Sequence, residues 1–326
     1  MDKLTKLDEK DRKILAELDK DARQTDSKIA KKVRVSKQVA NYRIQNLVNK
    51  KVIENFYTVI NVGKLGLNSY YVFLQLENIN KEQEITLLKK INNLDYVGWL
   101  VSGVGKWDAI ILLYANSIST FDNMLNKVIN ICGNHLHEYS FSTLVEAAHI
   151  SYKFLKHKEP SPVKQTEKAK SVELDKTDLK ILGAISQKAR ASIVEISAKT
   201  RISLHVVSYH LKSLVKSKII EGFKPKINIS KLGYQWHLLL LQFQRAEDKR
   251  KQEFIDFCKS HNKVYYVTST IGAYNLMLDL HVKGVEEFKE FLLDIKEKFS
   301  DVIKLYESMV LFDEYKINYL PKELIK

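Results

Sequence analysis

The sequence has few cysteines and no long apolar run. It contains two cysteines, Cys132 and Cys258, in 326 residues, which excludes a disulfide framework; both stand in apolar helical patterns that indicate small core residues. No apolar stretch approaches the roughly 18 residues that span a bilayer. The N-terminal MDKLTKLDEK is charged where a signal peptide has an apolar block. We therefore expect a folded cytoplasmic protein with no membrane partner.

The positive charge is concentrated in two segments. The formal net charge is +14, and 45% of the residues are hydrophobic, enough for two or more domains at this length. Residues 7–56 and 174–223 each carry about +5, whereas 57–155 carry about −1 and 224–326 about +2. This distribution predicts two local surfaces for a polyanion.

The chain is an internal duplication. At an offset of 167 residues, the two halves align without a gap from Leu7 and Leu174, through Gly105 and Gly272, to Tyr152 and Tyr319. Each half therefore contains the same two modules.

Each half begins with a pattern of three short helices. Asp8 is placed to N-cap the first helix and Ser36 the third, and the short turn between the second and third is typical of a helix-turn-helix. VIENFYTVIN follows in the first copy and IIEGFKPKIN in the second, where Gly222 and Pro225 are turn signals. The pattern predicts a small two-stranded wing in each module.

The third helix of each copy, within 36–51 and 203–218, is the candidate recognition helix. Its helical period separates a polar face from an apolar one. The polar positions in the first copy are Gln38, Tyr42, Gln45 and Asn49. The positions predicted to face inward in the second copy are Val207, Leu211, Leu214 and Val215.

The second module of each half reads as strand, helix, strand, strand, helix, strand. In the first copy the helices are expected at 81–93 and 119–132. This order predicts a ferredoxin-like sheet with helices on one face and a second face free to pack against another sheet. The fold class is therefore α+β: a tandem repeat of a winged helix-turn-helix followed by a ferredoxin-like βαββαβ domain.

The stretch KHKEPSPVKQTEKAKS between the halves has the composition of a linker. The predicted organisation is a winged helix-turn-helix at 1–62, a ferredoxin-like effector and oligomerisation domain at 63–155, a linker at 156–173, a second winged helix-turn-helix at 174–229 and a second ferredoxin-like domain at 230–326.

Each half resembles a complete member of the Lrp/AsnC family, the leucine-responsive regulator type. The resemblance is carried by LDEKDRKIL, by Ser36, Val39, Arg43 and Leu47 in the third helix, by VIENF, by the Leu-Gly pair at 65 and by the GKWD turn at 105–108. It implies a transcription regulator that binds double-stranded DNA and is tuned by an amino acid or a similar small effector. The ferredoxin-like modules are expected to pair, either within the chain or between chains of a homo-oligomer.

Side-chain amides suit base edges, and lysines suit phosphates. Arg43 lies beside the apolar arc, so an ion pair with an acidic residue of the first helix is an alternative to a phosphate contact. The candidate DNA-binding residues of the first copy are Lys28, Lys32, Arg34, Ser36, Lys37, Gln38, Asn41, Tyr42, Arg43 and Gln45.

The second copy has a changed polar face. His210 stands where the first copy has Arg43, and Leu204 and His205 replace Lys37 and Gln38. Two interpretations follow: a reader of a different half-site with partly pH-dependent contacts, or a weakened module held mainly for pairing. The candidate residues here are Ser203, His205, Ser208, Tyr209, His210 and Lys212.

The GVGKWD stretch is not a phosphate-binding loop, because it falls between two strands with no helix to follow. The resemblance implies an effector here, near a subunit interface, with Asp108 for an amino group and the glycines for close backbone approach; a plain tight turn is the alternative. Asn275 replaces Asp108 in the second copy. The candidate effector residues are Ser102, Gly103, Gly105, Asp108, Gly272 and Asn275.

No metal or other cofactor is expected. Cys132, His135 and His137 form a small cluster, but the second copy does not repeat it.

Two other functions compete with the regulator. Sirohaem decarboxylases are similar to this fold and occur as fused pairs, but they carry an arginine-rich wing where this chain reads ENFYTVIN and EGFKPKIN. An effector-independent architectural DNA-binding protein is the other alternative. We expect a regulator and not an enzyme.

Overall fold

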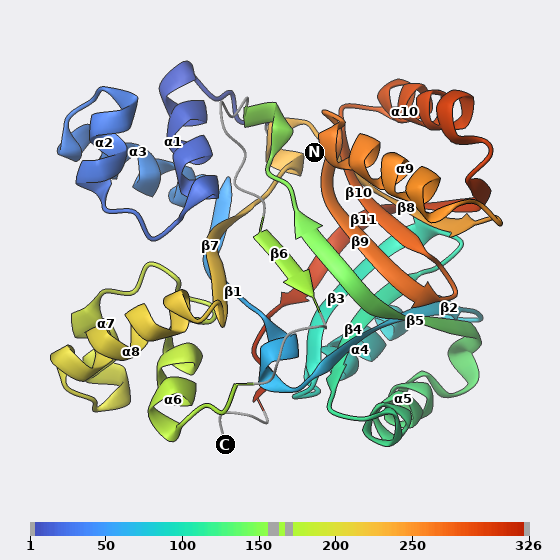
Figure 1. Cartoon of the computed structure of the whole chain (residues 1–326), viewed down its shortest axis with the longest axis horizontal. Helices are drawn as coiled ribbons and strands as arrows, with labels where there is room; N and C mark the ends of the chain where they lie inside the picture. Colours follow the sequence, from blue (N-terminus) through green and yellow to red (C-terminus); the bar gives the residue numbers. More distant parts are fainter. Residues whose placement is uncertain (1–3, 156–162, 167–171, 323–326) are drawn as a thin grey trace.

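A computed structural model describes residues 4–155, 163–166 and 172–322. Figure 1 shows two three-helix units on one side, a body of strands covered by helices on the other, and a two-stranded ribbon between them. In the described residues no helix is both long and apolar enough to cross a membrane.

The first three-helix unit contains α1 (Glu9–Lys20), α2 (Asp26–Val33) and α3 (Lys37–Asn49). Its caps confirm the sequence prediction: Asp8 accepts from the Asp11 amide at 2.8 Å, and Ser36 accepts from the Val39 amide at 3.2 Å. These side chains satisfy amides that the first turn of a helix leaves without a partner. The helices therefore begin where the capping residues place them.

The second unit repeats this arrangement in α6 (Lys176–Ile185), α7 (Ile193–Thr200) and α8 (Leu204–Lys216). Asp175 and Ser203 occupy the positions of Asp8 and Ser36 and make the same caps. The prediction that Val215 faces inward is wrong. Val215 is 42% exposed, because the buried face of α8 contains fewer residues than the apolar positions of the sequence.

The prediction of a two-stranded wing in each module is also wrong. Each module supplies one strand, β1 (Ile53–Ile60) or β7 (Ile220–Ile227), and the two pair antiparallel across the copies. Gly222 and Pro225 do not turn the chain back; they lie inside β7, opposite Val59 and Phe56. A proline is tolerated there because the two-stranded ribbon has only edge strands.

The ribbon exchanges core residues between the copies. Tyr57, Val59 and Ile60 of β1 lie in the core of α6–α8, whereas Ile227 of β7 lies in the core of α1–α3. The two predicted winged helix-turn-helix segments, 1–62 and 174–229, therefore share core residues.

Both βαββαβ predictions are confirmed. The first copy contains β2 (Asn68–Leu76), α4 (Lys81–Asn92), β3 (Val97–Gly105), β4 (Ala109–Ala115), α5 (Ile118–Cys132) and β5 (Leu136–His149). The second contains β8 (Gln235–Phe243), α9 (Asp248–Ser260), β9 (Val264–Gly272), β10 (Leu276–Val282), α10 (Val285–Phe299) and β11 (Ile303–Ile317). Short 3-10 helices lie at Val62–Leu65, Gly133–His135, Lys153–Leu155 and Ser230–Leu232.

The two sheets join at both edges. β3 pairs with β11, and β5 pairs with β9, so eight strands close in the cyclic order β5, β2, β4, β3, β11, β8, β10, β9. The inner faces share one core, which includes Phe73, Leu238 and Leu240. The pairing of the two halves thus occurs within one chain. A further strand, β6 (Val163–Thr166), lies inside the predicted linker and pairs with the end of β5.

Helices cover the outside of this barrel. α4 and α5 pack on the first sheet, and α9 and α10 on the second, each over its own apolar cluster. Cys132 and Cys258 lie in these two clusters, as predicted for small core residues. Burial raises the pKa of the Cys132 thiol to about 11 and that of Cys258 still further.

Candidate nucleic-acid interface

The first recognition helix, α3, presents a polar face to solvent. Gln38, Tyr42 and Gln45 are exposed, Tyr42 to 70% of its surface. The buried residues Ala40, Ile44 and Leu47 hold the opposite face against the unit's core. The side chains predicted to read base edges are therefore accessible.

The basic residues around α3 differ in how free they are. Lys28, Arg34 and Lys37 are exposed and have no ion pair among the described residues. Lys32 instead lies 2.5 Å from Glu17 and donates to Gln24 at 2.8 Å. These contacts make Lys32 the least available of the predicted phosphate ligands on α2 and its turn.

Two predicted DNA-binding side chains make polar contacts with other residues of the first unit. Arg43 lies 2.7 Å from both Asp8 and Asp11, the residues of the α1 capping box. The amide of Asp11 and the Arg43 guanidinium lower the pKa of Asp8. The Asn41 amide donates to Asp26 at 2.7 Å. The ion pair that was the alternative for Arg43 is therefore present, and its phosphate contact stays a prediction.

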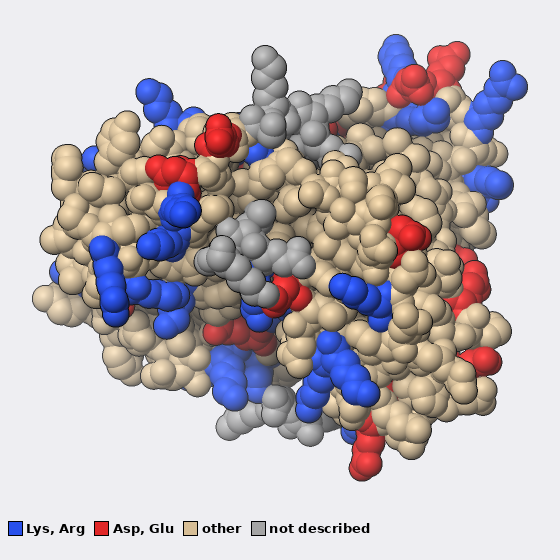
Figure 2. All heavy atoms as spheres, turned by 90° about the horizontal axis from the view of Figure 1, so that it is seen from below, with Lys and Arg blue, Asp and Glu red and all other residues tan. Residues whose placement is uncertain are grey.

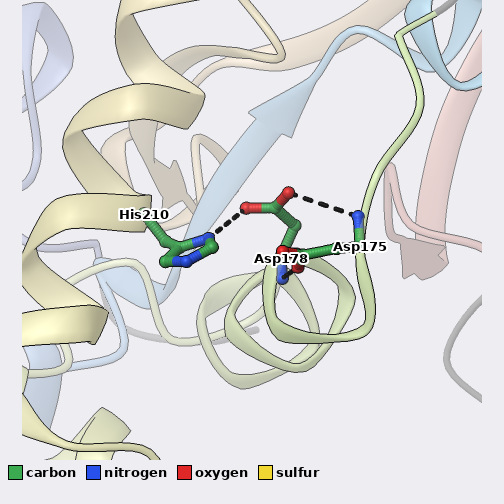
Figure 3. A group of neighbouring side chains, drawn as sticks. All are labelled: Asp175, Asp178 and His210. Carbon is green, nitrogen blue, oxygen red and sulfur yellow. Dashed lines mark hydrogen bonds and ion pairs between the residues drawn. The ribbon is translucent and has the colours of Figure 1, made fainter.

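The second unit reproduces the Arg43 contact with another residue. His210 Nδ1 lies 2.8 Å from Asp178, which shares the α6 capping box with Asp175 (Figure 3). The His210 ring is thus turned toward α6, and its DNA contact stays a prediction. These three residues are near enough to share an ion, but each already has a hydrogen-bond partner within the unit, as the Arg43 cluster does.

The second recognition helix, α8, has a less polar face. His205, Tyr209 and Lys212 are exposed, Tyr209 to 67%, and so is Leu204. Ser208 is half-buried, and Ser203 serves as the N-cap. Figure 2 shows Lys and Arg side chains projecting from the helix-turn-helix half of the molecule, at the left of this view.

A reciprocal pair of arginines joins the two units. Arg23 donates to the carbonyl of Ala189 at 2.5 Å, and Arg190 donates to the carbonyl of Ala22 at 2.5 Å. The guanidinium groups lie 5.6 and 5.4 Å from the ring centroids of Phe223 and Phe56, respectively.

Backbone bonds reinforce this arginine clamp. The Ala22 amide donates to Phe223 O, and the Ala189 amide donates to Phe56 O, both at 2.9 Å. Each α1–α2 or α6–α7 turn is thereby fixed to the ribbon strand of the other copy. We did not predict the clamp, although the Ala-Arg pair recurs at the offset of the duplication.

The predicted effector turns lie at the seams between the copies. Asp108 accepts from the Leu76 amide at 2.6 Å, and Asn275 accepts from the Phe243 amide at 2.8 Å. Asn275 thus keeps a structural hydrogen bond of Asp108 without its charge. The two residues play equivalent roles in the turns, which supports the turn alternative.

The glycines of these turns are required by protein packing. A Cβ at Gly103 would lie 2.5 Å from Val310 O, one at Gly105 would lie 2.3 Å from Ser308 O, and one at Gly272 would lie 2.5 Å from Phe141 O. The close approach predicted for an effector is therefore made by the partner strand of the other copy. The neighbouring Ser102 is 7% exposed.

The two turns also meet at one end of the barrel. Trp107 Nε1 donates to the Tyr274 hydroxyl at 2.7 Å, and Tyr274 in turn donates to Glu307. Both rings pack against Phe73.

The opposite end of the barrel holds a cavity of about 870 Å³ beneath the β1–β7 ribbon. Aromatic side chains from both copies line it, together with Asp279, Glu314 and Lys226. We did not predict this cavity. Asp279 stands out in the sequence as a charge within the apolar strand LMLDLHV, and this was the available signal.

The cluster of Cys132, His135 and His137 does not form a group of metal ligands in the described part of the chain. Cys132 is buried, and His137 lies 3.3 Å from Glu77.

Comparison with known proteins gives both sequence and structural similarity. The family described as winged helix-turn-helix DNA-binding matches residues 7–54 and 174–221. An uncharacterized HTH-type transcriptional regulator of Pyrococcus horikoshii is 27% identical over 151 residues, which is 46% of this chain and 94% of the relative. The HTH-type transcriptional regulator Ptr1 of Methanocaldococcus jannaschii is 29% identical over 37% of this chain and 80% of its own.

Among solved structures, the siroheme decarboxylase NirDL in complex with an iron-uroporphyrin III analogue has a TM-score of 0.63 at 15% identity. The match covers 98% of this chain and 99% of that one. This similarity shows the fold of the whole tandem. An AsnC family transcriptional regulator from Agrobacterium tumefaciens matches 42% of this chain and 89% of its own, with 20% identity and a TM-score of 0.38.

The helix-turn-helix match occurs once in each half, and relatives that align over most of their length are regulators that span about one half. Each half also has the capped three-helix unit, ribbon strand and βαββαβ sheet in the expected order. The chain therefore carries two segments that match the winged helix-turn-helix DNA-binding family, at 7–54 and 174–221, and over about half of its length it is similar in sequence to HTH-type transcriptional regulators.

Proposed function

We propose that the protein is a sequence-specific DNA-binding transcription regulator. The observation that carries this proposal is the joint presentation of α3 and α8: both expose polar faces, and the arginine clamp and ribbon fix them relative to each other. Two rigidly linked recognition helices suit a site made of two half-sites.

In the first unit, Gln38 and Gln45 would read base edges in the major groove. Lys28, Arg34 and Lys37 would bind phosphates beside it, since they are exposed and have no ion pair within the described structure. In the second unit, His205, Tyr209 and Lys212 would take these roles with fewer amides. The two half-sites are therefore expected to differ in sequence.

We also propose that an amino acid or similar small effector acts at the seam turns. The location supports this, because a ligand beside Asp108 would touch the junction of β3 with β11 and so both copies. Because Asn275 lacks the charge, we expect one such site per chain. Since the halves pair within the chain, one polypeptide supplies both reading helices, and further oligomerisation is not required for DNA binding.

Fluorescence anisotropy with the full chain tests the DNA proposal. The protein is titrated into a labelled duplex from the region upstream of its own coding sequence, and into a random duplex, at about 0.15 M salt. Gln38→Ala with Gln45→Ala should reduce the difference in affinity between the two duplexes, since each well-made base contact contributes about 1–3 kcal/mol. Lys289→Ala, on the exposed side of α10, is the matched control. Equal wild-type affinity for both duplexes would contradict the proposal.

A tetrapyrrole-modifying enzyme is the second candidate, favoured by the barrel cavity with His149 and His281 in its lining. NirDL, which shares the fold, was solved with an iron-uroporphyrin III analogue. A porphyrin that carries several carboxylates requires several cations, however, and Lys226 is the one Lys or Arg among the described lining residues. Addition of an iron porphyrin distinguishes the two: an enzyme of this type should give a stoichiometric shift of the Soret band.

A further inference from the structure

The cavity under the ribbon has aromatic walls. Trp99 and Trp236 approach each other with centroids 6.1 Å apart, and His281 stacks on Tyr265 at 4.5 Å. Tyr266 lies between His149 and Asp279 in the strand register, so these three side chains share the inner face of the barrel. A ligand in the cavity would therefore contact the faces and edges of several aromatic rings.

The charge in this cavity is negative. Glu54, Asp279, Asp313 and Glu314 contribute four carboxylates to the lining. Lys226 lies 3.0 Å from Glu54 and 3.0 Å from Glu314, so its ammonium group is already paired. Burial lowers the pKa of both His149 and His281 to about 3, which leaves the two rings neutral at pH 7.

Asp279 has no cation beside it in the described structure. It is 7% exposed, and the hydrogen bond it accepts comes from the indole of Trp236, at 2.7 Å. Burial raises its pKa to about 7, and the negative charge of Glu314 adds to this effect. The other groups that face it are the phenols of Tyr266 and Tyr71. Nearby, His149 Nδ1 is buried without a hydrogen-bond partner.

The polar part of the cavity is not a requirement of the fold. Leu112 and Tyr114 occupy the positions in β4 that Asp279 and His281 occupy in β10. The first copy thus builds its sheet with uncharged side chains at both positions. A buried carboxylate costs stability unless it is paired, so Asp279 suggests a partner that the protein does not supply.

We propose that this cavity is a binding site for a small organic cation with an apolar body. Its rings provide cation–π contacts and apolar surface, and Asp279 provides the opposite charge in a place where water is largely excluded. A neutral ligand would leave Asp279 without a cation, and an anion would be repelled by the carboxylates of the lining. The site lies at the opposite end of the barrel from the seam turns and does not depend on DNA binding.

The test uses two ions of nearly the same size and shape, tetraphenylphosphonium and tetraphenylborate, with the full-length protein. Titration calorimetry at pH 7.5 should show saturable 1:1 binding of the cation and none of the anion. This preference opposes the formal net charge of +14, so non-specific attraction cannot produce it. Equal or stronger binding of tetraphenylborate would overturn the proposal.

Two variants locate the site. Asp279→Asn keeps an acceptor for Trp236 and should weaken phosphonium binding at least tenfold. Glu138→Gln removes an exposed carboxylate that pairs with Lys106, and should leave binding unchanged. Equal affinity of Asp279→Asn and wild type, with both folded by circular dichroism, refutes the assignment.

A measurement on the wild type does not depend on any variant. Binding a cation beside Asp279 should release its proton, so the binding enthalpy at pH 7 should vary with the ionisation enthalpy of the buffer, and affinity should rise severalfold from pH 6 to pH 8. Binding without proton release and without pH dependence would place the cation elsewhere. An iron porphyrin is added in the same way. A stoichiometric Soret shift that tetraphenylphosphonium does not reverse would assign the cavity to tetrapyrroles instead.

Discussion

At the scale of single residues, one buried ion pair ties the first helical unit to the ribbon. Lys224 is fully buried in β7; its ammonium donates to the Asp19 carbonyl at 2.5 Å and lies 3.4 Å from the Asp19 carboxylate. The other carboxylate oxygen accepts from the Tyr152 amide at 3.1 Å. Removing one member leaves an uncompensated charge in the core.

We expect Lys224→Met to lower the free energy of unfolding by about 3–5 kcal/mol, because it leaves Asp19 buried without its cation. Lys32→Met, which breaks an accessible pair with Glu17, should cost less than about 1 kcal/mol. Urea unfolding followed by circular dichroism measures both. Equal costs for the two substitutions would show that the Asp19–Lys224 pair contributes little.

Lys37 and Arg43 lie on the same helix but are expected to act differently on DNA. Lys37→Gln should reduce the slope of log affinity against log salt by about 0.9, the value of one phosphate contact. Arg43→Gln should leave that slope unchanged and instead lower the melting temperature, because Arg43 pairs with Asp8 and Asp11. Anisotropy titrations between 50 and 300 mM salt test this. A lower slope for Arg43→Gln would show that Arg43 does contact a phosphate.

Asp279 predicts a pH dependence of stability. Its pKa is raised from 3.8 to about 7 in the folded state, so the folded protein holds the extra proton, and this residue's contribution to stability falls as pH rises from about 4 to about 7. The variant Asp279→Asn lacks that loss. The melting temperature of Asp279→Asn minus that of wild type should be larger at pH 8 than at pH 5. An equal difference at the two pH values would contradict the raised pKa of Asp279.

At the scale of elements, sequence reasoning was most reliable where the signal was local. Asp8 and Ser36 mark helix starts by bonds within four residues, and the structure has those bonds. The wing prediction was wrong because β1 pairs with a strand about 167 residues away, and no local pattern specifies such a partner. The cavity was missed for the same reason, since its walls come from both copies.

The arginine clamp is the element that we expect to set the geometry of DNA binding. Arg23→Ala combined with Arg190→Ala should loosen the α1–α2 and α6–α7 turns, because each loses a bond to the other copy. Selection of bound duplexes from a pool with variable half-site spacing should then give a broader spacing distribution than wild type. Arg245→Ala, exposed after β8, is the control. An unchanged distribution would assign the spacing to the ribbon alone.

At the scale of the whole molecule, neither half is complete. Residues 1–155 would lack β7, whose Ile227 lies in the core of their helical unit, and would expose the edges of β3 and β5. Unpaired edges promote self-association. We therefore expect residues 1–155 alone to dimerise or aggregate, and co-expression with residues 172–326 to restore a 1:1 complex. Light scattering after size-exclusion chromatography measures this; a stable monomeric half would contradict the exchanged core.

Covalent fusion of the two copies also changes what one substitution does. In a dimer of identical chains, a charge placed near the twofold axis always appears twice, and the two like charges repel each other across that axis. Here Asp279 has Leu112 at the equivalent position, so at this position the barrel carries an acid on only one side of its pseudo-axis. The clamp residues Arg23 and Arg190 make equivalent contacts in the two copies, whereas the cavity residues differ between the copies. The tandem can therefore bind an asymmetric ligand in a single orientation. A symmetric dimer would bind the same ligand in two equivalent orientations.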